Sequence, residues 1–274
     1  MDLNTITEVL RPTSADAVTK WENDFAWLAG GTWLFSEPQI HIHTLIDLET
    51  LRWPSLQASK NGLEIAATCK IVELDQFVEK APSDWTAAPL FRKCCRSFLA
   101  SFKIWNEATV GGNICMSLPA SPMVSLTTAL EGICTLWPRG GKPREVSVTE
   151  FVTGNHANVL AAGELLRSIH LPPTALKKSF AFRRFSLTNL GRSEVLLIGT
   201  KCREKGTFLL TVTAATLRPV QLQFKNIPPA EELKQAIDDA VPFSLYLDDT
   251  HGSPAHRKQL TYYFAEQIRE ELSA

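Results

Sequence analysis

The sequence has no block of like charge. Its 28 Lys and Arg residues are balanced by 29 Asp and Glu residues, which gives a formal net charge of −1. A basic face or stripe is the electrostatic footprint of a nucleic-acid-binding protein, and none occurs along this chain. The charge pattern therefore argues against nucleic acid as a partner.

Long apolar runs are also missing. No segment reaches the roughly 18 apolar residues that a membrane-spanning helix needs. The first 18 residues, MDLNTITEVLRPTSADAV, lack the basic start and the apolar core of a signal peptide. We therefore expect a cytoplasmic protein with no membrane span.

The cysteines lack the spacing of a metal site. No C-x-x-C pair occurs, so neither a zinc knuckle nor an iron–sulfur loop follows from local spacing. Buried free thiols in a reducing compartment are the favoured interpretation. The six cysteines are Cys69, Cys94, Cys95, Cys115, Cys134 and Cys202.

Other motifs for chemistry are weak or absent. The chain has no G-x-S-x-G nucleophile elbow. His41 and His43 are two residues apart, which on a strand places both on one face, but no third metal ligand follows and a surface strand is the favoured interpretation. His251 and His256 lie near two aspartates in a segment that we interpret as a solvated connection. We predict no catalytic residue and no metal ligand.

The apolar pattern that is present predicts an α+β protein. With 274 residues, 45% of them hydrophobic, the chain can bury a large core in two or three subdomains. Residues 1–20 are expected to form a short strand and then a helix. Leu90, Phe91, Cys94, Phe98 and Phe102 recur mainly at three- and four-residue spacings, which predicts one amphipathic helix over 89–104. Further strands are expected within 25–35, 43–51, 62–71, 194–202, 206–217 and 220–224, two strands around a Gly-Gly turn within 133–148, and a turn and short helix leading into a strand within 149–172. The remaining expected helices lie at 126–132, 229–238 and 256–272.

Glycine is scarce, yet two Gly-Gly pairs stand in the first half. They are LAGGTWL (28–34) and ATVGGNI (108–114), each with a threonine beside it. Glycine accepts a positive φ and lets a ligand touch the main chain, so successive amides can converge on an anion such as a pyrophosphate. Two ordinary tight turns are the alternative, since neither segment is the Rossmann G-x-G-x-x-G.

The longer context of these pairs carries a resemblance that covers essentially the whole chain. The chain resembles the FAD-binding subunit or domain of the molybdenum hydroxylases, the xanthine dehydrogenase and carbon monoxide dehydrogenase family. The most specific element is A-T-V-G-G-N-I followed by a proline-containing loop and an apolar helix. The supporting segments, in order, are LAGGTWLF, HTLIDLETL, NGLEIAATCKI, TEFVTGN, LAAGELLRSIHLP and HRKQLTYYFAEQI.

The resemblance implies an α+β fold of the vanillyl-alcohol-oxidase (PCMH) type. Two FAD-binding subdomains, expected at 1–55 and 56–175, would hold FAD between them. A C-terminal flavoprotein domain of one sheet and helices would follow at 176–274. The resemblance implies that the glycine pairs lack side chains so that FAD can lie against the backbone.

The resemblance also implies the cofactor contacts. The first loop would wrap the pyrophosphate, the second loop would face it, and an apolar and a basic contact would come from further along. The residues at the matching positions are Trp27, Leu28, Ala29, Gly30, Gly31, Thr32, Trp33, Leu34, Ala108, Thr109, Gly112, Asn113, Cys115, Leu166 and Arg183. The FAD is expected to be bound without a covalent bond.

Three positions depart from the family pattern. Where the family has P-x-S-D after the second loop, with an aspartate that holds a ribose hydroxyl, this chain has Pro122. Trp33 replaces the usual polar residue after A-G-G-T, and Trp105 replaces a basic residue before Asn106. The polar anchors are lost while the glycine backbone is kept. The two tryptophans are equally compatible with plain core or interface roles.

The function implied is that of an electron-transfer flavoprotein subunit of an oxidoreductase. Its FAD would receive electrons from a partner 2Fe-2S subunit, while a molybdopterin subunit oxidises the substrate. The external acceptor would be NAD, oxygen or a quinone. A flavin-free structural subunit of the same complex is the main alternative, and a free-standing flavin oxidase is the third.

Overall fold

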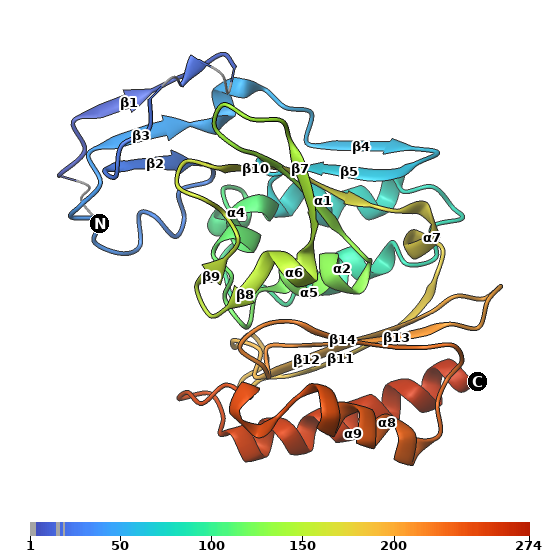
Figure 1. Cartoon of the computed structure of the whole chain (residues 1–274). Helices are drawn as coiled ribbons and strands as arrows, with labels where there is room; N and C mark the ends of the chain where they lie inside the picture. The colour runs from blue at the N-terminus through green and yellow to red at the C-terminus, as the bar shows by residue number, and fades with distance from the viewer. Residues whose placement is uncertain (1–3, 15–16, 19) are drawn as a thin grey trace.

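The first sheet is small and parallel. The computed structural model describes residues 4–14, 17–18 and 20–274. In this part of the chain, β1 (Glu8–Leu10) and β2 (Phe25–Leu28) both pair in parallel with β3 (Thr44–Asp47), in the order β1-β3-β2. A short 3-10 helix, η2 (Leu48–Leu51), follows directly after β3. Figure 1 shows this sheet in dark blue beside the larger second sheet.

The second sheet has five strands in the order β4-β5-β10-β6-β7, paired antiparallel. Helices from the connections cover one of its faces (Figure 1). The strands are β4 (Leu56–Ser59), β5 (Gly62–Ala66), β6 (Ile133–Trp137), β7 (Arg144–Ser147) and β10 (Leu165–Leu171). The connecting elements are α1 (Ile71–Phe77), η3 (Val78–Lys80), α2 (Pro89–Cys95), α3 (Phe102–Trp105), α4 (Val110–Cys115), α5 (Pro122–Ala129), α6 (Val148–Phe151), β8 (Val152–Gly154) and β9 (Ala157–Asn158).

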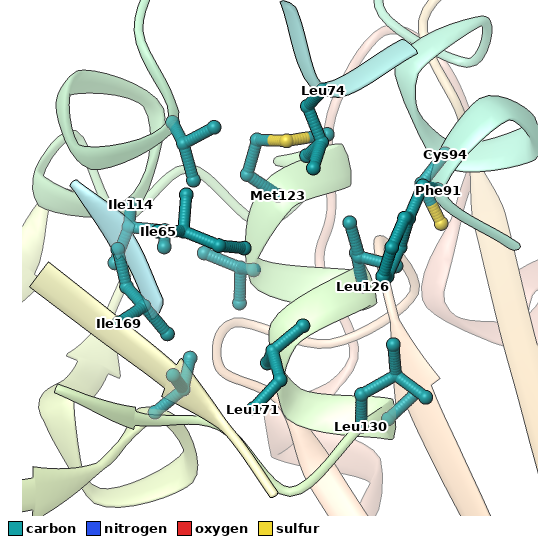
Figure 2. Close-up of a cluster of buried hydrophobic side chains, with 14 of the residues drawn as sticks. Ile65, Leu74, Phe91, Cys94, Ile114, Met123, Leu126, Leu130, Ile169 and Leu171 are labelled. Carbon is teal, nitrogen blue, oxygen red and sulfur yellow. The ribbon is translucent and has the colours of Figure 1, made fainter. Parts of the chain in front are cut away.

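The main core lies between this sheet and its helices. Alternation along β5 and β10 points apolar side chains such as Ile65 and Ile169 inward, while Glu64 and His170 pair on the other face. Figure 2 shows these inward side chains opposite α5, which contributes Met123. All eight residues of α5 are buried, because the helix packs on both of its sides.

The C-terminal third is a four-stranded antiparallel sheet between two layers of helices. It comprises β11 (Ser179–Phe185), β12 (Val195–Lys201), β13 (Phe208–Thr213) and β14 (Val220–Phe224). The helix α7 (Pro173–Leu176) leads into it, and α8 (Ala230–Ala240), η4 (Phe243–Leu245) and α9 (Pro254–Ser273) follow it. One face packs on α5, where the Ser125 and Thr213 hydroxyl oxygens are 2.7 Å apart. The other face packs on α8 and α9 (Figure 1).

Most expected strands and helices are present, but the helix predicted over 89–104 is wrong. The structure divides it into α2 and α3. The Ser97 hydroxyl donates to the carbonyl of Lys93 at 2.8 Å, which competes with the helical pattern at the end of α2. Leu99 and Phe102 are left exposed. The helix expected within 1–20 falls partly outside the described residues.

The sheets follow one another along the chain in the same order as the expected domains. The division at residues 55 and 175 stays a prediction, because the sheet positions do not fix where one folding unit ends. Among the described residues, no helix is both long and apolar enough to cross a membrane.

Candidate functional site

The first Gly-Gly pair forms a compact turn at the carboxyl end of β2. The Phe35 amide donates to the Gly31 carbonyl at 2.8 Å, and the Ser36 amide donates to the Trp33 carbonyl at 2.9 Å. Gly31 has a φ of +66°, a value that glycine adopts without strain. Within the part of the chain that the structure describes, the amides from Gly31 to Leu34 have no acceptor. Four successive donors are therefore available to an anion.

This turn rests directly on the backbone that leads into the second Gly-Gly pair. A Cβ added to Gly30 would lie 1.9 Å from the carbonyl oxygen of Glu107 and 3.2 Å from the Cα of Ala108. No side chain fits in that space. The two glycine segments, which are some 80 residues apart in the sequence, are therefore neighbours in the fold.

The second pair is helical, which corrects the expectation of a loop or turn. Gly111 and Gly112 lie in α4, and the Thr109 hydroxyl caps this helix by accepting from the Gly112 amide at 3.0 Å. The amides of Val110 and Gly111 donate to the carbonyls of Cys69 and Ala67 at 2.8 and 2.9 Å. These amides are not free for an anion, so converging amide donors stay a prediction for the first loop alone.

Gly111 and Gly112 of α4 lack a side chain for different structural reasons. A Cβ on Gly111 would lie 2.4 Å from the Cβ of Ala67, so this glycine permits close packing of α4 on the segment after β5. A Cβ on Gly112 would meet only the Thr109 hydroxyl within 4 Å. The face of α4 at Gly112 is therefore open, and a ligand can approach the main chain there.

Asn113 and Cys115 are held by contacts within the protein. The Asn113 side-chain oxygen accepts from the Ser121 hydroxyl at 2.6 Å and from the Met123 amide at 3.0 Å. The Ser121 hydroxyl also caps α5 by accepting from Val124, and Pro122 is buried in the first turn of that helix. Burial raises the pKa of the Cys115 thiol to about 12.

Aromatic side chains surround the two glycine segments. Trp33 and His156 have ring centroids 5.6 Å apart, and the His156 amide donates to the Ser117 carbonyl at 3.1 Å. The first loop therefore contacts the β8–β9 turn, and that turn contacts the segment after α4. Trp27 and Trp105 each precede one glycine segment. Among the described residues, the buried indole N–H of each has no partner.

The two remaining predicted contacts lie in β10 and β11. Leu166 is buried in β10, within the core of the second sheet. Arg183 faces α9, where its guanidinium donates to Gln267 at 2.8 Å and to Glu271 at 2.7 Å. The structure therefore does not bring Arg183 to the glycine segments.

Alternation along β11 places Arg184 on the other face, with Phe182 toward the second-sheet core. Its guanidinium donates to Ser193 at 2.7 Å and to the Asn189 carbonyl at 3.3 Å, which orders the β11–β12 loop. Burial lowers the pKa of Arg184. Arg184 rather than Arg183 is thus on the same face of β11 as Phe180 and Phe182.

The cluster near His256 corrects the expectation of a solvated connection. The Arg257 side chain is buried and donates to Asp249 at 2.6 Å and to the Ala214 carbonyl at 2.8 Å. His256 pairs with the buried carboxylate of Glu194 at 2.6 Å. These contacts fasten the start of α9 to the C-terminal sheet.

The His41 and His43 side chains do not form a metal site. Both residues precede β3, so the expectation of a surface strand is wrong. His43 lies 3.5 Å from Asp24. In residues 4–14, 17–18 and 20–274, no three His, Cys, Asp or Glu side chains form a group able to hold a metal.

The comparison with family models identifies the glycine segments as part of a known domain. Residues 5–174 match the model described as the FAD binding domain in molybdopterin dehydrogenase. The chain belongs to this family. FAD is the cofactor of the family, and its members are oxidoreductases. The resemblance found in the sequence is confirmed.

Relatives of this FAD-binding domain include much longer proteins. The chain is 27% identical over 130 residues to xanthine dehydrogenase 1 of Arabidopsis thaliana, and to the same extent to xanthine dehydrogenase 2. The match covers 44% of this chain but 9% of each plant protein. The chain thus corresponds to a small part of those enzymes.

Solved structures share the fold along nearly the whole chain. Quinoline 2-oxidoreductase from Pseudomonas putida 86 gives a TM-score of 0.80 at 19% identity, covering 99% of this chain and 98% of the other. Carbon monoxide dehydrogenase from Hydrogenophaga pseudoflava gives 0.79 at 18% identity, with 96% of both chains covered. The expected FAD-binding fold with an additional C-terminal sheet and helices is confirmed.

Proposed function

We propose that this chain is the FAD-binding electron-transfer subunit of a molybdenum hydroxylase. It would take electrons from the iron–sulfur clusters of a 2Fe-2S subunit and pass them to an external acceptor. The observation that carries the proposal is the first glycine turn, whose amides lack acceptors within the described residues and which lies against Glu107 beside α4. That arrangement occurs in a chain of the FAD-binding family.

The residues at this site fit FAD. The amides from Gly31 to Leu34 and the Thr32 hydroxyl would donate to the pyrophosphate, where fixed donors stabilise an anion without a charged side chain. Gly112 leaves room against the main chain of α4. The indole N–H groups of Trp27 and Trp105 are buried donors that a cofactor could satisfy. Bound FAD would supply the acceptance and release of electrons.

The other predicted contacts remain part of the proposal, but with different roles. Ala108, Thr109, Asn113 and Cys115 would touch FAD as surface of α4 and its N-terminal cap rather than as amide donors. We propose Arg184 instead of Arg183 as the basic contact with FAD, because Arg184 lies on the face of β11 toward the second sheet.

Partners are required because the substrate must be oxidised elsewhere. The cysteines of this chain lack the spacing of cluster ligands, and four of the six are buried. A 2Fe-2S subunit and a molybdopterin subunit would supply the remaining redox centres. The external acceptor is proposed to be NAD, oxygen or a quinone.

The first test measures the cofactor. Purified protein should carry flavin that absorbs near 450 nm, and acid precipitation should release all of the colour because the bond is not covalent. A colourless protein that takes up no added FAD would contradict the proposal. Colour that stays with the precipitate would contradict non-covalent binding.

The second test separates electron transfer from a structural role. Two features favour a flavin-free structural subunit as the alternative. Pro122 stands where the family has an aspartate. The Phe35 ring covers one side of Gly31, since its Cε2 lies 2.6 Å from the place of a Gly31 Cβ. The complete complex should reduce its acceptor when substrate is added, and the complex stripped of FAD should not. Full activity without FAD would support the structural alternative.

A further inference from the structure

Lys70 connects the 3-10 helix after the first sheet to the residue that precedes the second glycine segment. It is the residue before α1, and its side chain is 19% exposed. Its ammonium group pairs with the Glu49 carboxylate in η2. It also lies 3.4 Å from both the carbonyl oxygen and the carboxylate of Glu107. We call these three residues the Lys70 bridge.

One partner of Lys70 follows the strand beside β2, and the other precedes the second glycine segment. Glu49 follows β3, the strand paired with β2, and β2 leads into the first glycine turn. Glu107 immediately precedes Ala108 and the cap of α4, and its carbonyl is the atom against which Gly30 lies. The bridge therefore joins the two sides of the contact between Gly30 and Glu107.

The backbone of Lys70 is fastened to the second segment and to the linker between the sheets. The Ile71 amide donates to the Ala108 carbonyl at 2.9 Å, and the Val110 amide donates to the Cys69 carbonyl at 2.8 Å. Glu73 accepts from the Lys70 amide and from the Ser55 hydroxyl, each at 2.8 Å. Movement of the Lys70 backbone relative to α4 is thus restrained, and its side chain makes the contact with Glu49 in η2.

The positive charge of Lys70 also compensates the negative charges of Glu49 and Glu107. Glu49 and Glu107 are 54% and 64% exposed, and without Lys70 their two carboxylates would be uncompensated near the proposed pyrophosphate site. Exposed ion pairs contribute little to folding stability. The effect of Lys70 is therefore expected in ligand binding more than in the stability of the chain.

We propose that Lys70 is a positioning residue for FAD, which holds the first glycine turn at the distance from α4 that the pyrophosphate requires. This inference rests on the proposed function, since it concerns affinity for FAD. Lys70 lies in the segment NGLEIAATCKI, but the sequence assigns it no role, because its partners are 21 and 37 residues away.

The test compares Lys70→Met with a matched control. Lys177→Met removes a lysine that pairs with Asp84 at 2.9 Å, with both side chains more than half exposed. Apoprotein of each variant is titrated with FAD and with riboflavin, which lacks the pyrophosphate. Lys70→Met should weaken FAD binding by about tenfold, which corresponds to about 1.4 kcal/mol, with less than about a twofold change for riboflavin. Lys70→Arg should restore most of the FAD affinity, and Lys177→Met should match wild type.

A second readout needs no cofactor. Amide hydrogen exchange in the 30–34 turn of the apoprotein should be faster in Lys70→Met than in wild type, because local opening becomes easier. Equal exchange and equal FAD affinity would overturn the inference. So would full recovery of FAD affinity in Lys70→Met/Glu49→Gln/Glu107→Gln, because charge alone would then explain the loss. Wild-type protein that binds no FAD would instead overturn the proposed function itself.

Discussion

Gly30 lies against the carbonyl oxygen of Glu107 so closely that a Cβ on Gly30 would be 1.9 Å from it. This contact joins the first glycine turn to the chain entering α4. Because the obstructing atom is backbone, no side-chain rotation relieves the clash. This spacing of the two segments requires that residue 30 has no side chain.

Gly30→Ala should separate the two segments and abolish FAD binding in a chain that still folds. The added methyl group must displace either the turn or the residues around Glu107. FAD titration and circular dichroism of the purified variant measure both properties. Gly154→Ala is the matched control, since its Cβ would meet only the Ala157 Cβ at 3.6 Å. Normal FAD affinity in Gly30→Ala would refute the proposed contact between turn and cofactor.

Gly112→Val should also lose FAD, for a different reason. The open face of α4 at Gly112 would be filled by the new side chain, which would also press on the Thr109 hydroxyl 2.8 Å from the Cβ position. Retention of a full complement of flavin would show that FAD does not approach α4 at this point. Loss of the cap accounts for about 1 kcal/mol of stability, so the thermal transition should fall only slightly.

One thiol in six should react quickly with a disulfide reagent at about pH 8. Burial raises the pKa of Cys69, Cys94, Cys95, Cys115 and Cys134, so these cysteines remain protonated thiols. Cys115 and Cys202 are both partly exposed, but burial of the thiol group raises the pKa of Cys115 to about 12, so Cys202 is the thiol expected to react quickly. Cys202→Ser should remove the fast phase, and unfolding in denaturant should expose every remaining thiol. A fast phase that persists in Cys202→Ser would show that one of the buried sites opens readily.

Acid should weaken the chain partly through Glu164. The Arg144 guanidinium, which donates to both carboxylate oxygens at 2.7 Å, lowers the pKa of Glu164, and burial opposes this shift. The stabilisation is therefore fully present above the unfolded pKa of about 4.3 and is lost as pH falls through the lower folded value.

Glu164→Gln measures this contribution. Urea unfolding should show a loss of about 1 to 2 kcal/mol at about pH 7 and a smaller further loss toward about pH 3 than in wild type. Glu79→Gln is the control, since this carboxylate is 70% exposed and pairs with Arg92. Parallel pH profiles for wild type and Glu164→Gln would assign the acid sensitivity to other groups.

Local patterns predicted the strands well because each has a continuous apolar run or an alternation that one buried face requires. They failed where a tertiary contact decided the conformation. Gly111 reads as a turn residue, yet it is helical because α4 packs on Ala67. The apolar spacing from Leu90 to Phe102 reads as one helix, yet the chain breaks after Cys95 and leaves Phe102 in solvent.

The candidate site could be predicted only where it depends on glycine residues. The first turn could be found because backbone contact with an anion requires residues without side chains. Lys70 could not be found, since its partners are distant in sequence. Arg183 and Arg184 are adjacent arginines, and only the register of β11 decides which one faces the second sheet.

The burial of α5 on both sides changes what a domain boundary means in this chain. The matched family segment ends at residue 174, but α5 lies within that segment and presents one side to β12 and β13. A chain cut after residue 174 would expose Ser125 and the apolar side chains around it to water. We therefore expect the FAD-binding segment and the C-terminal sheet to unfold in a single transition.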